Sequence, residues 1–547
     1  MDKTSKIQSH APALVALAGI IAGLVLAKQS SAAILPQLLA AVFLGFISWR
    51  LALKGRDSLW LPAFLLGVTL AFWAYGTLRL PSAVDDSLLL RPPREAQLEL
   101  IVERIMQPGN DFGQASGIAR VIEANATSQL TDNSRIYFQL SAADSSTLNI
   151  AQGMQLMATG VLHPIHPDVP ADSFQGYLRA IGVHYRFDRT SEAIELQPAP
   201  LFRRLCNQIH LRFQDFLRLG EPEDRGLSRI YIAMLLGLKT ELTPEQSDRF
   251  RMTGTMHLFA ISGLHIGVVA TVVAQALLLV RVPRSLRPLI GLPLVYLYVE
   301  ITGAAPSAIR AFLMVTFFWA SIALERQRSP LAALVASAVC VLIIQPAQLW
   351  QMGFQLSYLV VLSILLFGLP LHEALWLNLR PYKYLPESGW STTQHFVFWF
   401  SDKVLLLFSI SLSAWLASAP LGAGFFGFIA PFAVLINMLL VNLATLVISG
   451  GVISLALASV SLTDLSAFLN HAAWLGISLM DGLVRLNISL PSAIISSADF
   501  PRFMSYTGVA LYFGSLFLTS TSNRLTVKYL LPTSLVVLCL LAGQLIA

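Results

Sequence analysis

The chain has few charged residues for its length. Only 12% of its 547 residues are Asp, Glu, Lys or Arg, whereas soluble globular domains carry about 25%. Hydrophobic residues make up 55% of the chain, and the mean hydropathy is +0.65. This composition excludes an ordinary cytosolic enzyme and a disordered protein, and it predicts a protein that crosses a membrane many times.

Common catalytic and metal-binding patterns are also missing. The three cysteines, Cys206, Cys340 and Cys539, are too few for a disulfide-dense scaffold, and none forms a CxxC pair. The sequence has no Walker A motif, no HExxH and no GxSxG. The nearest approach to a metal site, His163-Pro-Ile-His166-Pro-Asp168, has no third histidine close by. We therefore expect no catalytic residue, no cofactor and no metal ion in this chain.

Long apolar runs open the chain and fill its second half. Three runs near the ~20 residues needed to cross a bilayer come first: Ala11–Ala27, Ala33–Trp49 and Trp60–Leu78. The later runs are His257–Val280, Leu286–Thr302, Ala311–Leu324, Leu331–Ile344, Phe354–Leu369, Val404–Phe426, Pro431–Ile448, Tyr506–Thr519 and Tyr529–Ile546, with further stretches at Gly451–Val460 and Ala467–Leu483. The fold class predicted is a polytopic α-helical membrane protein with roughly eleven to thirteen membrane segments, some short or broken.

Basic residues in the short loops predict the orientation of the chain. Lys3 and Lys6 precede the first run, and Arg50, Lys54 and Arg56 follow the second. Because Lys and Arg are enriched in cytoplasmic loops, we expect a cytoplasmic N-terminus. Three crossings then place the next segment outside the cytoplasm.

That segment, 81–200, has the composition of a small β domain. Alternating or β-rich runs occur at Leu98–Ile105, Ile118–Glu123, Arg135–Leu140, Met154–Val161, Val183–Phe187 and Ile194–Leu196, and a helix is predicted over Asp172–Gly182. Five or six short strands suit a small barrel, with an OB-type barrel as one candidate. The stretch 91–200 carries eight Lys or Arg residues against twelve Asp or Glu residues, so it is net acidic.

These observations divide the chain into five parts. We predict N-terminal membrane helices over 1–80, the extracytoplasmic barrel over 81–200, a connecting helix over 201–224, the main membrane domain over 225–495 and C-terminal membrane helices over 496–547. The connecting helix is amphipathic at Leu201–Leu219. It is compatible with a helix on the membrane surface and equally with one that packs between the two domains.

Polar residues interrupt the apolar run that begins at His257. His257, Ser262, Gly263 and His265 lie within HLFAISGLHIGVV. The Ser-Gly pair predicts a broken helix, which a membrane tolerates where the freed backbone groups line a cavity or are buried in protein. The alternative interpretation is a packing motif in which small residues let helices approach closely.

A second polar group surrounds a predicted helix start. Glu300 and Arg310 flank Gly303, Ala304, Ala305, Pro306 and Ser307, and Pro306 fits the first turn of the helix that follows. Arg310 beside that helix start suits an anion, either a phosphate or Glu300. The alternative is a simple Glu300–Arg310 ion pair. Gln355 and Ser357 add polar groups to another apolar run, where interhelical hydrogen bonding is the alternative role.

At these residues the chain resembles the ComEC-type competence proteins, which form the inner-membrane DNA channel of natural transformation. Met256–Val268 (MHLFAISGLHIGV) looks like the family signature H-L-x-A-I-S-G-L-H. Leu235–Leu238, Tyr298–Met314 and Gln351–Leu362 match flanking blocks in order, and Asp172–Gly182 resembles the end of the extracellular OB-like domain of the family. The resemblance covers most of residues 1–495.

The resemblance implies that one strand of captured DNA passes inward through the helices and that the barrel helps to receive it. The matching positions, which we predict to line the DNA path, are His257, Ser262, Gly263, His265, Gly303, Pro306, Ser307, Arg310, Gln355 and Ser357. The implied partners are single-stranded DNA, membrane lipid, an extracytoplasmic DNA receptor, a cytoplasmic helicase-like ATPase and single-strand-binding proteins.

Two departures from the family matter for function. Many members continue into a metallo-β-lactamase-like domain, and this chain has no HxHxDH motif, so we expect a separate nuclease and a channel without catalysis. The barrel segment is net acidic, although a domain that grips a polyanion should carry a basic stripe. The alternative functions are a secondary transporter for a small anionic solute and a membrane enzyme with a divergent site, such as a metal-dependent nuclease.

Overall fold

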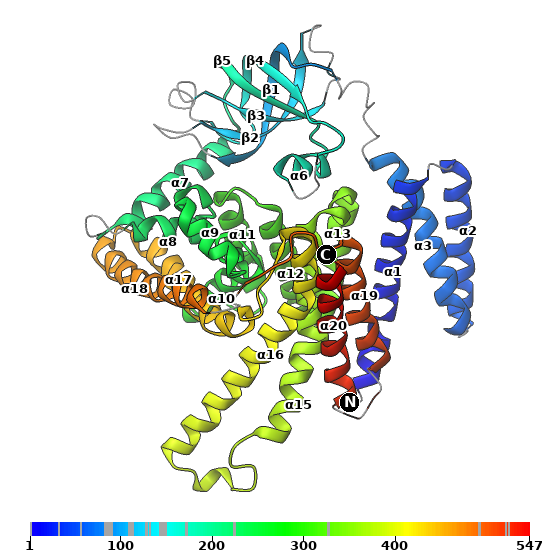
Figure 1. The fold of residues 1–547 in the computed structure, drawn as a ribbon, viewed down its shortest axis with the longest axis vertical. Helices are drawn as coiled ribbons and strands as arrows, with labels where there is room; N and C mark the ends of the chain where they lie inside the picture. Colours follow the sequence, from blue (N-terminus) through cyan, green and yellow to red (C-terminus); the bar gives the residue numbers. More distant parts are fainter. Residues whose placement is uncertain are drawn as a thin grey trace.

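The computed structural model describes residues 3–30, 33–54, 57–80, 91–107, 114–125, 130, 133–141, 150–169, 173–221, 226–324, 329–490, 494–519, 522, 524 and 526–546. A small β-barrel stands above a larger domain of helices, and a hairpin of two long helices extends from the opposite end of that domain (Figure 1). The predicted class, a polytopic helical membrane protein with one inserted barrel, is confirmed.

Five strands close into the barrel in the order β1-β2-β3-β5-β4. They are β1 (Arg94–Gln107), β2 (Ser116–Ala124), β3 (Arg135–Gln139), β4 (Gln155–Pro164) and β5 (Tyr185–Gln197), and α6 (Phe174–Ala180) lies between β4 and β5. The pairs are antiparallel except β3 with β5, which run parallel. Alternate residues of β4 are buried, so every second side chain enters the barrel core.

The last strand differs from the sequence expectation. The sequence predicts two strands, at Val183–Phe187 and Ile194–Leu196, but Tyr185–Phe187 of the first run and all of the second belong to the single strand β5. The pairing of β5 with β4 shifts register opposite Thr159–Val161, and Arg189 has a φ of 53°. A bulge with one residue in the left-handed region bends the strand. That bend interrupts the hydrophobic alternation on which the prediction depended.

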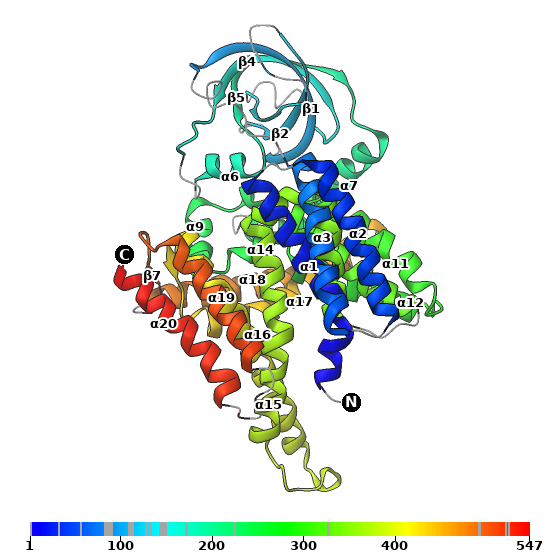
Figure 2. The same cartoon turned by 90° about the vertical axis from the view of Figure 1, so that its right-hand side faces the viewer.

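The first three helices form an antiparallel bundle at one side of the helical domain. They are α1 (Lys3–Gln29), α2 (Ile34–Leu53) and α3 (Asp57–Arg79), and α1 also contacts α13 (Pro330–Ile344). Gly23 allows α1 to approach α3 closely, because a Cβ there would lie 2.4 Å from the carbonyl oxygen of Thr69. These helices stand beside the rest of the domain in Figure 1 and in front of it in Figure 2.

The main helical domain begins with α7 (Leu201–Arg218). It continues through α8 (Leu227–Leu236), η2 (Lys239–Glu241), α9 (Pro244–Met252), η3 (Met256–Phe259), α10 (Gly263–Leu279), α11 (Arg287–Ile301), α12 (Pro306–Ala323), α13, η4 (Pro346–Trp350), α14 (Met352–Ser363), η5 (Ile364–Gly368), α15 (Leu369–Leu379), η6 (Glu387–Gly389), α16 (Thr392–Phe426), α17 (Ala433–Ser459), α18 (Thr463–Ser489), α19 (Arg502–Thr519), η7 (Thr526–Leu530) and α20 (Leu531–Ile546). Two short strands, β6 (Phe428–Ile429) and β7 (Ile495–Ser496), pair with each other.

Seven of the described helices are long and apolar enough to cross a membrane, and shorter apolar helices accompany them. The runs Pro431–Ile448 and Gly451–Val460 form the single helix α17. Its glycine pair does not break it, because Gly451 packs against Leu235 and lets α8 approach closely. The total number of crossings, from eleven to thirteen, stays a prediction.

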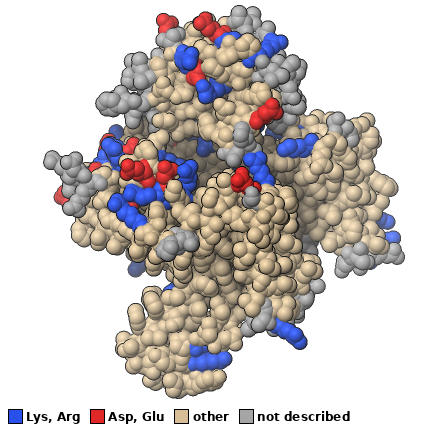
Figure 3. Space-filling model, in the orientation of Figure 1, with Lys and Arg blue, Asp and Glu red and all other residues tan. Residues whose placement is uncertain are grey.

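Charged side chains gather on the barrel and on the helices just below it, whereas the lower helical surface carries few (Figure 3). Arg50 and Lys54 lie at the end of α2 that is farther from the barrel, and Arg380 and Lys383 lie in the turn between α15 and α16 (Figure 1). The orientation of the chain in the membrane stays a prediction.

Candidate functional site

The apolar run that begins at His257 contains a break, as the sequence predicts. A single turn, η3, is followed by extended residues, and α10 begins only at Gly263. Ser262 caps α10: its N–H donates to His265 Nδ1 over 3.4 Å, and its Oγ lies 3.1 Å from the same nitrogen. His265 is fully buried. This histidine therefore supports the start of the helix and does not face open space.

His257 and Gly263 differ from His265 in their exposure. The side chain of His257 is exposed, and its Nδ1 lies 3.0 Å from the carbonyl oxygen of Gly254. Gly263 is exposed as well, and a Cβ at that position would meet no atom within 4 Å. The imidazole of His257 and the backbone of Gly263 are therefore accessible at the break.

The turn between α11 and α12 stands against this break. Gly303 and Ala304 have φ angles of 85° and 48°, so two successive residues adopt left-handed backbone conformations. Gly303 has no atom within 4 Å of its Cβ position. Pro306 begins α12, and Ser307 Oγ donates to the carbonyl oxygen of Ile261 over 2.6 Å. This hydrogen bond joins the start of α12 to the residue before Ser262.

Arg310 projects from the first turns of α12 into the protein and is only 3% exposed. One terminal nitrogen donates to the carbonyl oxygen of Gly353 over 2.8 Å, and the other donates to Gln348 Oε1 over 3.3 Å. Its Nε has no hydrogen-bond partner. Within the described part of the chain, no carboxylate pairs with this guanidinium.

Glu300 does not pair with Arg310, so that alternative is wrong. Its carboxylate pairs instead with Arg203 in the first turn of α7. The helix α7 also places His210 Nδ1 2.9 Å from the carbonyl oxygen of Ile301. These contacts hold α7 against the end of α11, which favours the packing interpretation of the amphipathic helix.

The two polar positions on α14 have different surroundings. Gln355 Nε2 donates to the carbonyl oxygen of Leu349 over 3.1 Å, which fixes the turn before α14. Ser357 is half-buried on the same helix. Hydrogen bonds of Ser307 and Arg310 thus link the start of α12 to Ile261, the residue before Ser262, and to Gly353 at the start of α14. We call Ser262, Ser307, Arg310, Gln348 and Gly353 the Arg310 site.

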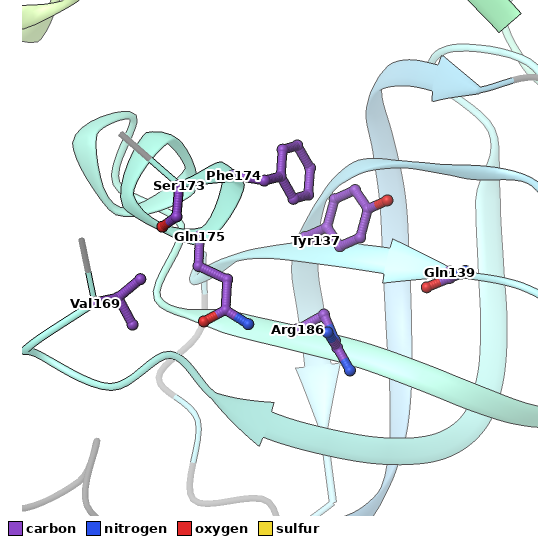
Figure 4. A pocket seen from close by; sticks show the side chains of 7 residues that line it. All are labelled: Tyr137, Gln139, Val169, Ser173, Phe174, Gln175 and Arg186. Atoms are coloured by element: carbon purple, nitrogen blue, oxygen red, sulfur yellow. The ribbon is translucent and has the colours of Figure 1, made fainter. Parts of the chain in front are cut away.

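A second candidate site is a pocket of about 580 Å³ on the barrel. It lies between α6 and the strands β3 and β5, and α6 itself lies on the side of the barrel that faces the helical domain (Figures 1 and 2). The rings of Tyr137 and Phe174 meet edge to face at 5.1 Å, and both line the pocket with Gln139 and Arg186 (Figure 4). Phe174 is 50% exposed.

Polar groups surround these aromatic rings. Tyr177, on the same helix as Phe174, stacks with it at 6.3 Å, and its hydroxyl group accepts a hydrogen bond of 3.5 Å from Arg104. Arg186 pairs with Asp188 over 2.6 Å, which offsets its charge. Partly exposed rings beside arginine side chains can stack with planar ligands and contact anionic groups.

A model of the competence protein family matches residues 234–522, which is more than half of the chain. The chain belongs to the competence protein family. This match covers the broken start of α10, the turn before α12 and the beginning of α14, and it confirms the resemblance stated on sequence grounds.

Two curated relatives resemble this competence protein over part of their length. ComE operon protein 3 of Bacillus subtilis (strain 168) is 29% identical over 222 residues, which are 40% of this chain and 28% of that protein. An uncharacterized protein of Aquifex aeolicus (strain VF5) is 28% identical over 235 residues, 43% of this chain and 49% of that protein. The aligned regions thus cover less than half of either relative. No solved structure matches.

Sequence reasoning missed several residues of these sites in the competence protein. The partners of Arg310, Gln348 and Gly353, are far from it in sequence, and no pattern linked them to Arg310. The barrel residues Phe138, Tyr185 and Phe187 are core residues, whereas Tyr137 lines the pocket and Tyr177 stacks on Phe174. The sequence analysis did not single out Phe174. Its place at the exposed start of a short helix could have identified it.

The two histidines of the barrel contact different carboxylates. His163 lies 3.0 Å from Asp188, whereas His166 lies 3.4 Å from Asp168. Across the residues described here, no group of three or more His, Cys, Asp or Glu side chains has the arrangement of a metal site.

Proposed function

We propose that this competence protein conducts single-stranded DNA across the bacterial inner membrane during natural transformation. The observation that carries the proposal is Arg310, a buried guanidinium among membrane-spanning helices with no described carboxylate partner. A charge at bilayer depth costs at least ~2.5–3.5 kcal/mol on insertion scales, so such residues mark substrate paths by default.

The surroundings of Arg310 favour an anion that visits the site. Its present partners are a carbonyl oxygen and an amide oxygen, which are neutral acceptors. The starts of α10 and α12 meet beside it through the Ser307–Ile261 hydrogen bond, and the first N–H groups of a helix carry partial positive charge. Exposed glycines at both turns, Gly263 and Gly303, leave open space there. A phosphate diester has the charge and size that suit this arrangement.

The barrel pocket offers aromatic rings on which bases can stack, and the Arg310 site contains no such ring. Every nucleobase has a π-face, so exposed aromatic rings such as Phe174 and Tyr177 bind single strands with little sequence preference. The pocket lies beside α6, on the side of the barrel that faces the helices. In the proposed path the barrel receives the strand, and the Arg310 site contacts its phosphates within the membrane.

The topology completes the proposal. Basic turns lie at the end away from the barrel, which supports a cytoplasmic N-terminus and an extracytoplasmic barrel. The chain contains no NTPase or nuclease motif. An extracytoplasmic DNA receptor, a separate nuclease, a cytoplasmic helicase-like ATPase and single-strand-binding proteins therefore accompany the channel in this scheme.

The decisive test replaces Arg310 in a naturally competent host. Arg310→Gln keeps a donor for the Gly353 carbonyl but removes the charge, whereas Arg310→Lys keeps the charge. Arg485→Gln is a control at an exposed arginine that pairs with Asp481. A hydrogen bond to a charged group contributes about 1.5–3 kcal/mol, so we expect Arg310→Gln to lower transformation about ten- to hundred-fold and Arg310→Lys to lower it less.

Three measurements give this test its meaning: transformation frequency, the amount of protein in the membrane, and the amount of labelled DNA held outside the inner membrane. For Arg310→Gln we expect a normal amount of protein in the membrane and a normal or increased amount of labelled DNA outside the inner membrane. The transformation frequency should be low. Normal transformation in that variant contradicts the role of Arg310. Transformation that is normal even when the whole protein is deleted contradicts the DNA channel and leaves the transport of a small anion.

A further inference from the structure

A second cavity, of about 480 Å³, lies at the other ends of the helices that form the Arg310 site. Its lining includes Gln275 and Leu278 of α10, Arg284 of the following turn, Arg287 of α11, and Trp319 and Ile322 of α12. At 1.5 Å per residue, Trp319 lies about 20 Å along α12 from Pro306. The cavity is therefore separate from the proposed DNA path.

The polar groups of this cavity are mainly basic. Arg287 Nε donates to the carbonyl oxygen of Val282 over 2.9 Å, which anchors the side chain at the start of α11. No acidic side chain in the described ranges lies within ion-pair distance of Arg284 or Arg287. The positive charge at this end is thus available to an anion that comes from outside the protein.

The remaining lining is apolar and adjoins a lipid-facing surface. Leu279 and Leu289, on either side of the same turn, are 84% and 71% exposed. The indole of Trp319 lies against Gly291, where a Cβ would stand 2.5 Å from the ring. This close contact places an aromatic wall beside the arginine residues. A phospholipid carries its phosphate next to acyl chains, so its chains can cover such a wall while its phosphate meets the arginine residues.

We propose that this cavity binds the headgroup of an anionic phospholipid, with Arg284 and Arg287 at the phosphate and the acyl chains along Leu278, Trp319 and Ile322. The basic turn after α10 lies, by the proposed topology, on the cytoplasmic side, where anionic lipids attract Lys and Arg. Basic pockets between membrane helices on that side bind anionic headgroups. The bound lipid fixes the ends of α10, α11 and α12 relative to one another.

Native mass spectrometry of the full chain in mild detergent tests the proposal. Phosphatidylglycerol is titrated against phosphatidylcholine with the same acyl chains, and inorganic phosphate and an oligothymidylate are added as competitors. Arg284→Gln with Arg287→Gln removes both charges, and Ala274→Phe fills the cavity at another lining residue without changing charge. Arg380→Gln with Lys383→Gln is the matched control in the basic turn between α15 and α16.

Each basic residue near an anionic lipid contributes about 1 kcal/mol, so the double variant should bind phosphatidylglycerol about thirty-fold more weakly. We expect Ala274→Phe to weaken binding as well and the control pair to leave it unchanged. Equal binding of phosphatidylcholine, or wild-type binding by the double variant, overturns the proposal. Displacement of the lipid by inorganic phosphate or by the oligonucleotide also overturns it. If the double variant does not fold, Ala274→Phe decides the outcome alone.

Discussion

The barrel and the helical domain arrange their side chains in opposite ways. In the barrel, Leu98, Leu100, Phe138 and Phe187 are fully buried, and charged residues occupy the outer surface (Figure 3). The helical domain exposes large apolar side chains along most of its helices and buries polar groups. The difference identifies the two solvents: water surrounds the barrel, and lipid surrounds the helices.

The polar interior of the helical domain is held by hydrogen bonds. Ser454 on α17 contacts Ser466 and Asn470 on α18, and Asn470 donates to the carbonyl oxygen of Phe216 at the end of α7. Ser363 Oγ lies 2.6 Å from the hydroxyl oxygen of Tyr512. Because lipid offers no hydrogen bonds, these groups must find partners inside the protein. Arg310 Nε is one of several buried polar atoms in the described part of this domain that have no partner, and it belongs to a charged side chain.

The largest effect expected from this comparison concerns solubility. A fragment that spans 91–200 should fold in water without detergent, because its apolar side chains already fill the core of a closed barrel. Residues 201–547 should stay in solution only with detergent. Circular dichroism and a cooperative thermal transition report the fold of the fragment. A fragment that aggregates, or that melts without cooperativity, contradicts the independent barrel.

A smaller effect should separate two ion pairs of the same type. Glu103 on the barrel pairs with Arg120 and Arg135, which are 45% and 43% exposed, whereas Glu300 is only 5% exposed and its partner Arg203 is 26% exposed. Glu103→Gln should cost about 0.2–1 kcal/mol. Breaking a buried ion pair costs about 3–5 kcal/mol of folding free energy. For Glu300→Gln the cost should be smaller than this, because Arg203 is partly exposed.

Thermal unfolding of the full chain in detergent measures both variants. We expect the midpoint to fall further for Glu300→Gln than for Glu103→Gln. The double variant Arg203→Met with Glu300→Gln removes both charges, so it should recover part of the loss. Equal shifts for the two single variants would show that the environments of Glu103 and Glu300 do not differ as described.

The smallest effect concerns pH and the barrel alone. Burial, with a smaller contribution from Arg179, lowers the pKa of His184 from its ordinary value of 6.5. The unfolded chain therefore binds a proton that the folded barrel rejects, and the barrel loses stability as the pH falls below about 6.5. Amide hydrogen exchange of barrel peptides in the full chain measures this between about pH 7.5 and about pH 5.5. His184→Gln should show a weaker pH dependence, and an identical dependence contradicts the assignment.

Local patterns in the sequence predicted much of the fold. The break at Ser262-Gly263, the helix start at Pro306 and the amphipathic α7 all follow from short-range rules of helix capping and periodicity. The barrel strands were located from alternation, except where the bulge at Arg189 bends β5. The glycine pair in α17 looked like a boundary, but packing against α8 keeps that helix continuous.

The candidate site was less predictable because its contacts join distant segments. Arg310 and Ser307 were identified from the sequence, but the partners that hold them, Gly353 and Ile261, are backbone carbonyl groups whose positions depend on the whole fold. Glu300 was expected beside Arg310 because the two are near in sequence, and it pairs with Arg203 from another helix. His265 was expected near the DNA path and is fully buried. Its role in DNA conduction stays a prediction.

The link from β5 to α7 consists of three residues, Pro198, Ala199 and Pro200, and Ala199 is buried against the barrel. Because the two proline rings restrict the backbone, this link is short and stiff. Arg203 and His210 of α7 contact Glu300 and Ile301 at the end of α11. The strand β5, this link and α7 therefore form one continuous connection between Arg186 in the barrel pocket and the end of α11, just before α12.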